Sequence, residues 1–108
     1  MTDNEYHQRV DAIFLQLEES IDLIEQVDLD YESSGGILTI DFPNQTKLIF
    51  NKQAPNHQIW LATKYDGHHF DWDGALWIDN RTGKEFWLLV SEAATRQAGV
   101  EVSFKQGE

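Results

Sequence analysis

Seven carboxylates lie within sixteen consecutive residues, in the stretch LEESIDLIEQVDLDYE at positions 17–32, and no lysine or arginine interrupts them. Carboxylate oxygens are hard ligands that suit ferric iron, calcium, magnesium and manganese and also accept ferrous iron. Like charges at this density repel one another, so the stretch indicates a use for its charge, as a cation site or as a surface for a basic partner. The candidate ligands are Glu18, Glu19, Asp22, Glu25, Asp28, Asp30 and Glu32.

These acids do not form a loop that gathers several oxygens around one ion. An exposed helical side chain offers one or two oxygens and leaves the other coordination positions to water, so we expect weak, multi-site and poorly selective binding. A plainer interpretation is the solvated face of an amphipathic helix, and the charge pattern alone favours it. The continuation of the acids beyond the helix argues against that interpretation.

Three further candidate ligands precede this stretch, one helical turn apart, at Asp3, His7 and Asp11. Asp3 and His7 are spaced i, i+4, so a carboxylate and an imidazole could hold a borderline metal ion together. The alternative is an ordinary exposed histidine beside an acid that suits the positive end of the helix dipole.

The elements that must position these groups follow from periodicity. Thr2 and Glu5 fit a capping box, and the residues behind them predict an amphipathic helix over roughly residues 3–24. The period then changes to two, so Asp28, Asp30 and Glu32 are expected on the outer face of a half-buried strand. The apolar positions of the helix are Tyr6, Val10, Ile13, Phe14, Leu17, Ile21 and Ile24.

Short alternating segments separated by turn residues predict further strands after Gly35-Gly36. A second helix is expected over NRTGKEFWLLVSEAATRQAG, with a capping box from Thr82 to Glu85 and a stop at Gly99. Its apolar stripe is Phe86, Leu89, Val90 and Ala93. The expected inner residues of the strands are Leu38, Ile40, Phe42, Leu48, Phe50, Ile59, Leu61 and Thr63, and the tail is expected to pack Val100, Val102 and Phe104 between the helices.

The connections between the strands are too short for parallel crossovers, so the sheet should be antiparallel. The predicted fold class is α+β, a two-layer α-β sandwich in which two helices cover one face of about six strands. We expect one domain over residues 1–108. Trp60 should then project from the uncovered sheet face beside Asn51 and Gln53, with the composition of an interface hot spot.

Composition excludes several classes of function. The net charge is -11, and residues 1–32 hold ten of the nineteen acids but one of the eight bases, which argues against nucleic acid and anionic membranes. The chain has no cysteine, so thiolate catalysis and thiolate metal sites are excluded. Neither a membrane span nor a secretory signal is recognisable, and a cytoplasmic protein is expected. No set of nucleophile, base and orienting group is evident, so we expect no enzyme.

The segment NKQAPNHQIWLATKYDGHHFDW resembles the bacterial frataxin family. Its matching residues follow the motif Asn-x-Gln-x-Pro-x-x-Gln-Ile-Trp-Leu and are Asn51, Gln53, Pro55, Gln58, Ile59, Trp60 and Leu61. The segments YHQR, GGILTI and RTGKEFWLLVSEAAT support the resemblance, which covers essentially the whole chain.

This resemblance implies a frataxin-like sandwich and a role in iron–sulfur cluster assembly. It implies weak binding of Fe2+ and Fe3+ at the seven acids of positions 18–32, which we name the acidic ridge. It also implies association with a cysteine desulfurase and an iron–sulfur scaffold protein, as an iron-responsive regulator and candidate iron donor. The implied partner-binding residues are Glu18, Glu19 and Asp22 on the ridge and Asn51, Gln53 and Trp60 on the sheet. A monomer is expected without metal, and oligomers with it.

Two other functions stay open on the sequence. A ferroxidase or iron-storage protein would need a closed, carboxylate-bridged site, preferably with Glu-x-x-His pairs, and the chain has no Glu-x-x-His. A weak ferroxidase activity would still be compatible with the ridge. An acidic adaptor whose metal binding is incidental would bind its partner indifferently to iron.

Overall fold

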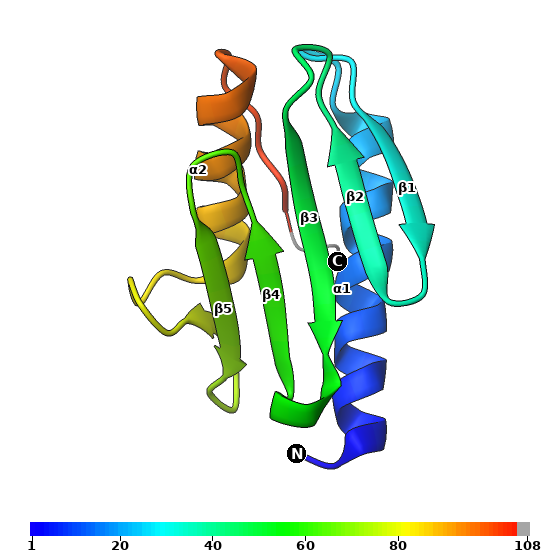
Figure 1. Ribbon diagram of the computed structural model, residues 1–108, viewed down its shortest axis with the longest axis vertical. Helices are drawn as coiled ribbons and strands as arrows, with labels where there is room; N and C mark the ends of the chain where they lie inside the picture. Colours follow the sequence, from blue (N-terminus) through cyan, green and yellow to red (C-terminus); the bar gives the residue numbers. More distant parts are fainter. Residues whose placement is uncertain (106–108) are drawn as a thin grey trace.

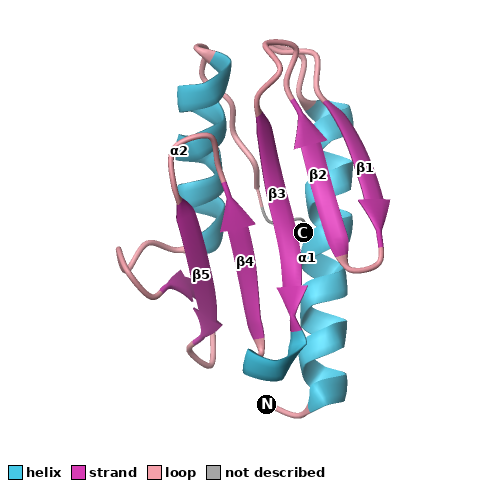
Figure 2. Cartoon of the chain, in the orientation of Figure 1, coloured by secondary structure: helices cyan, strands magenta, loops and turns pink. Residues whose placement is uncertain are grey.

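Two helices cover one face of a six-stranded sheet in the computed structural model, which describes residues 1–105 (Figures 1 and 2). The strands follow one another in chain order, and each pairs antiparallel with the next. The predicted α+β sandwich is therefore confirmed. The strands are β1 (Asp30–Ser34), β2 (Ile37–Asp41), β3 (Lys47–Gln53), β4 (Gln58–Ala62), β5 (Gly67–Trp72) and β6 (Trp77–Asp79); the helices are α1 (Asp3–Leu23), α2 (Phe86–Ala98) and a 3₁₀ turn, η1 (Ala54–Asn56).

The first helix begins as its sequence predicts. The Thr2 hydroxyl accepts the Glu5 backbone N–H at 3.1 Å, and the Glu5 carboxylate accepts the Thr2 N–H at 2.9 Å, which completes the capping box. The helix ends at Leu23, and Ile24 is already extended. Its buried residues are Tyr6, Val10, Ile13, Phe14, Leu17 and Ile21, so the predicted stripe is confirmed except at its last position.

The start of α2 differs from its prediction. Glu85 is the N-cap, and its carboxylate accepts the backbone N–H groups of Trp87 and Leu88. The capping box predicted from Thr82 is wrong, because the hydroxyl and the backbone N–H of Thr82 both donate to Asp79 at the end of β6. Gly99 ends the helix as predicted, with a left-handed φ of 75° that favours glycine.

The core lies between the helices and the inner face of the sheet. All of the predicted inner strand residues except Thr63, which follows β4 and is half-buried, are buried. On α2, Phe86, Leu89 and Val90 are buried as predicted, whereas Ala93 is half-buried and Ala94 lies deeper. These buried residues form one contiguous cluster.

The first strand and the tail correct two details. The strand β1 is the edge of the sheet and all five of its residues are exposed, so the expected half-buried strand is wrong; Leu29, just before it, is buried. In the tail, Val102 and Phe104 are buried but Val100 is exposed. Figure 1 shows the tail running between α2 and α1. Residues 106–108 of the predicted domain lie outside the described residues, and within 1–105 no helix is long and apolar enough to cross a bilayer.

Candidate functional site

The acidic ridge runs over α1, the connection after it and β1. The helix α1 and the strand β1 lie side by side at one edge of the sandwich (Figure 1). Tyr31 pairs with the buried Ile40 of β2 and so points to the helix side of the sheet, where the charge of Glu18, followed by desolvation and the charge of Asp22, raises the pKa of its phenol. Asp30 and Glu32 alternate with Tyr31 and pair with Asp41 and Thr39, so they point to the uncovered face of the sheet; the helical and strand acids are therefore neighbours at one edge but lie on different sides of β1.

The ridge acids are free of cationic partners. All are exposed except Glu18, which is half-buried, and none of the seven forms an ion pair within residues 1–105. Their negative charge is consequently uncompensated by the described part of the chain. A cation or a basic surface brought to the ridge would meet this charge directly.

The ridge does not enclose a coordination sphere. Among the described residues, no three His, Asp or Glu side chains come close enough together to hold one metal ion. The donor set consists of hard oxygens on an open surface, which fits hydrated ferrous or ferric iron as well as other divalent or trivalent cations. The arrangement can thus bind several ions weakly, each through one or two side chains.

Asp11 does not belong to this free set. Its Oδ1 lies 2.7 Å from Nζ of Lys52, which reaches it from β3. Lys52 stands 41 residues further along the chain, so no local pattern predicts this contact. The expectation of Asp11 as an unpaired ligand is therefore wrong.

Asp3 also has a partner that the sequence did not indicate. Its Oδ1 lies 2.7 Å from Nε2 of His57, at the end of η1, whereas His7 is exposed and makes no recorded bond to Asp3. His57 adopts a left-handed conformation with φ 51°, and its ring stacks on Tyr6 at 5.0 Å between centroids. The turn between β3 and β4 places this imidazole at the N-terminus of α1, which the spacing of Asp3 and His7 could not predict.

The sheet face opposite the helices carries an ordered polar and aromatic surface, which we name the indole face: Asn51, Gln53, Gln58, Trp60, His69 and Asp71. Trp60 lies between the buried Ile59 and Leu61 in sequence, so its side chain projects from the opposite face of the sheet. Asn51 is its cross-strand partner, and His69 stacks on the indole at 4.2 Å.

A hydrogen-bond chain fixes this face. The Trp60 indole N–H donates to Gln58 Oε1 at 2.8 Å, and Gln58 Nε2 donates to Asp71 at 2.8 Å. Gln53 is the cross-strand partner of Gln58. The predicted group of Trp60, Asn51 and Gln53 is thus brought together, and the ring is held in place before any partner arrives.

Comparisons with known proteins agree with this geometry. The family model described as a frataxin-like domain matches residues 1–100. An iron-sulfur cluster assembly protein CyaY from Pseudoalteromonas atlantica is 53% identical over 104 residues, which cover 96% of this chain and 95% of that protein.

Solved structures give the same result. Frataxin from Psychromonas ingrahamii superposes with a TM-score of 0.87 at 43% identity, covering 97% of this chain and 99% of the other. A trimeric frataxin from the yeast Saccharomyces cerevisiae, complexed with ferrous iron, superposes with a TM-score of 0.69 at 28% identity, covering 88% of this chain and 86% of the other. With this fold, the Trp60 motif and these relatives, the chain belongs to the frataxin family.

Proposed function

We propose that this chain acts in iron–sulfur cluster assembly, as an iron-binding regulator of a cysteine desulfurase and its scaffold protein and as a candidate iron donor. One observation carries the proposal: seven carboxylates that form no ion pair within residues 1–105 lie on α1, on β1 and on the connection between them, at one edge of the sandwich, whereas the indole face lies on β3, β4 and β5. Two distinct surfaces suit two distinct partners. The relative named an iron-sulfur cluster assembly protein supports this reading.

Electrostatics links iron to docking. Glu18 and Asp22 are one turn apart on α1, and a like-charged pair at that spacing costs about 0.2–0.5 kcal/mol. A bound cation removes this repulsion and lowers the negative charge that attracts a basic patch on the desulfurase. Iron loading would therefore tune the association rate and the affinity of the complex.

An anaerobic titration with ferrous iron, followed by backbone amide NMR, tests iron binding. Paramagnetic broadening is expected first at residues 18–32, before the amides of β4, β5 and α2 respond. A variant with Glu18→Gln, Glu19→Gln and Asp22→Asn should lose the broadening on α1. The matched control, with Asp41→Asn, Glu92→Gln and Glu101→Gln, removes equal charge elsewhere and should retain it. Broadening centred away from residues 18–32 would refute the ridge as the iron site.

The two docking surfaces can be tested with variants that serve as each other's control. Charge reversal of Glu18, Glu19 and Asp22 to lysine should lower desulfurase affinity at least about tenfold, because three attractive charges become repulsive. The same variant should keep scaffold affinity. Trp60→Ala should keep desulfurase affinity but should weaken scaffold binding by about 2 kcal/mol or more, as for a central aromatic anchor. Calorimetry with each purified partner measures both. Equal losses toward both partners would contradict separate surfaces.

The same experiments distinguish the alternatives. Oxygen consumption with ferrous iron well above the spontaneous rate would favour the ferroxidase function. Desulfurase affinity that depends on ionic strength but not on iron would favour the acidic adaptor. Light scattering during the titration checks the prediction of a metal-free monomer and metal-induced oligomers, which the trimeric yeast frataxin supports.

A further inference from the structure

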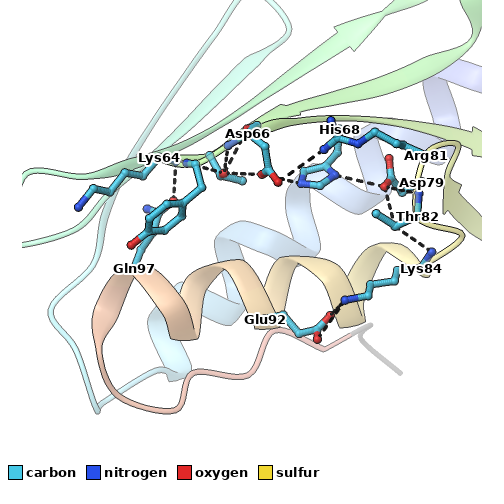
Figure 3. Close-up of polar contacts among 11 residues, drawn as sticks. Lys64, Asp66, His68, Asp79, Arg81, Thr82, Lys84, Glu92 and Gln97 are labelled. Atoms are coloured by element: carbon cyan, nitrogen blue, oxygen red, sulfur yellow. Dashed lines mark hydrogen bonds and ion pairs between the residues drawn. The ribbon is translucent and has the colours of Figure 1, made fainter.

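A buried histidine lies between two aspartates near α2, far from the ridge in the fold (Figure 3). His68, on β5, has a side chain that is only 8% exposed. Its Nδ1 lies 3.2 Å from Oδ2 of Asp79, and its Nε2 lies 2.8 Å from Oδ1 of Asp66. Both ring nitrogens therefore contact a carboxylate oxygen.

Asp79 is held as an ionised acceptor. Its Oδ2 receives the Thr82 hydroxyl at 2.6 Å and the Thr82 backbone N–H at 3.1 Å in addition to His68. A proton on Asp79 would have to sit on Oδ1, which is buried and has no hydrogen-bond partner within the described residues. Burial by itself raises the pKa of Asp79, but the hydrogen bonds from Thr82 and His68 bring that pKa below its ordinary value.

Asp66 is ionised for similar reasons. Burial is the largest single influence and raises the pKa of its carboxyl, but the hydrogen bonds from the Thr63 hydroxyl and from His68, with the charges of His68 and Arg81, together bring that pKa below its ordinary value. The Thr63 hydroxyl donates to Oδ1 at 2.9 Å, and the Arg81 guanidinium lies 3.5 Å from Oδ2. An ionised carboxylate only accepts hydrogen bonds, so each nitrogen of His68 must donate, and only the imidazolium form has two donors.

We propose that His68 is a doubly protonated latch that ties the β4–β5 turn at residues 63–66 to the loop after β6, and that loss of one ring proton releases the turn. A neutral ring would aim a lone pair at one of the two carboxylates. Asp79 is fully buried and keeps its Thr82 donors, whereas Asp66 is partly exposed, so Asp66 is the side that leaves.

Release of the turn would alter a groove beside α2. The turn carries Tyr65, whose ring lies under the Arg96 guanidinium of α2 at 3.6 Å. His68, Asp66 and Tyr65 all line the groove, which has a volume of about 400 Å³. Displacement of Asp66 would therefore move Tyr65 relative to α2 and change the shape of this groove.

Nearby cations oppose a positive charge on His68, whereas the two carboxylates in contact with the ring favour it. Arg81, Lys84 and Arg96 disfavour a further positive charge, although Lys84 is paired with Glu92 at 3.0 Å. The two carboxylates are in direct contact with the ring, in a site shielded from water, so their attraction exceeds repulsion from the more distant cations. The groups around His68 are Lys64, Tyr65 and Asp66 from the turn, Asp79, Arg81 and Lys84 from β6 and the following loop, and Glu92 and Arg96 from α2.

Long-range ¹H–¹⁵N NMR of the four histidine rings of the full chain tests the latch, since it distinguishes imidazolium from either neutral tautomer. At pH 7.5 His68 is expected to show two protonated nitrogens, because both of its ring nitrogens contact a carboxylate oxygen. As the pH rises further, its ring shifts and the amide shifts of Lys64, Tyr65 and Asp66 should change together. A neutral His68 ring at pH 7.5, or turn amides that do not follow the ring, would overturn the proposal.

The variant Asp66→Asn isolates the charge. Asparagine keeps an acceptor for Nε2 but removes the negative charge, so the ring form with two protonated nitrogens should be less populated at pH 7.5 than in the original chain. The control Asp41→Asn removes a half-buried surface aspartate that is paired with Lys47, far from His68 in the sheet, and should leave the ring unchanged. Circular dichroism checks that both variants fold. If one of them does not fold, the NMR measurement on the unmodified chain decides the proposal on its own. An unchanged His68 titration in folded Asp66→Asn would refute the latch.

Discussion

Truncation of Phe86 to alanine is expected to lower the free energy of unfolding by about 3–5 kcal/mol, a large part of the 5–15 kcal/mol typical of a whole domain. Phe86 is fully buried at the first position of α2. Its ring meets Phe70 at 4.9 Å and Phe50 at 5.8 Å between centroids, so it joins the helix to two strands. Three elements cannot all collapse into the space that it leaves, and a cavity remains.

Urea denaturation followed by tryptophan fluorescence measures this loss. The matched control is Leu88→Ala, two residues further along the same helix, where the side chain is 54% exposed. That variant should change stability by less than about 0.5 kcal/mol. Alanine is at least as good a helix former as phenylalanine or leucine, so a similar loss in both variants would contradict burial as the cause.

Local patterns were sufficient for most of the fold. The Thr2–Glu5 capping box, the 3.6-residue stripe of α1 and the alternation of Leu38 and Ile40 each depend on neighbours within a few residues, and all are confirmed. The box from Thr82 to Glu85 fits the same local rule but is wrong. Asp79, three residues earlier, binds the Thr82 hydroxyl, and this competing contact moves the helix start to Glu85.

The position of β1 at the edge of the sheet could not be read from its own alternation. An edge strand has one neighbour and, in this fold, little covering from the helices, so Tyr31 is exposed although it alternates with acids. Exposed acids on such an edge also discourage pairing with another chain. The same carboxylates can therefore protect the edge and present charge to a cation.

Contacts between distant segments explain what the sequence missed in the candidate sites. Lys52 forms an ion pair with Asp11, which lies 41 residues away in the sequence. His57 contacts the carboxylate of Asp3, which lies 54 residues away. His68, by contrast, had a local signal: it shares the inward-facing side of β5 with Phe70, an unusual place for a histidine. A polar residue at an inward position predicts a polar partner, and here there are two, the buried Asp79 and the partly exposed Asp66.

The distribution of cations strengthens the interpretation of the ridge. Four lysine and arginine side chains pair with acids outside it: Lys47 with Asp41, Lys52 with Asp11, Arg81 with Asp66 and Lys84 with Glu92. Arg9 stacks over Trp72 and Arg96 over Tyr65. Within residues 1–105 all seven ridge acids lie outside the ion pairs, and although other acids (Glu5, Asp71, Asp73, Glu85 and Glu101) do too, only the ridge gathers seven within sixteen residues. The pattern favours a surface whose charge is balanced by something other than this chain.

Replacement of Asp79 by alanine is expected to lower the free energy of unfolding by about 3–5 kcal/mol at pH 7. Asp79 is fully buried, and its carboxylate accepts from Thr82 and His68. Its removal leaves one nitrogen of the buried His68 without an acceptor, and an unpaired buried group costs much more free energy than the intact contact contributes. Urea denaturation at pH 7 provides the measurement. The control Asp41→Ala, at a half-buried surface position that loses only its contact with Lys47, should cost at most about 1 kcal/mol.

The pH dependence separates a charge effect from a simple loss of volume. The pKa of Asp79 is lowered in the folded chain, so the ionised form contributes stability that is fully present above the unfolded aspartate pKa of about 3.9. As the pH falls below that value and through the lower folded pKa, this contribution is lost. The difference in stability between the original chain and Asp79→Ala should therefore be constant from about pH 5 to 7 and shrink below about pH 4. A difference that stayed the same in acid would show that packing, and not the ionised carboxylate, holds the loop before α2.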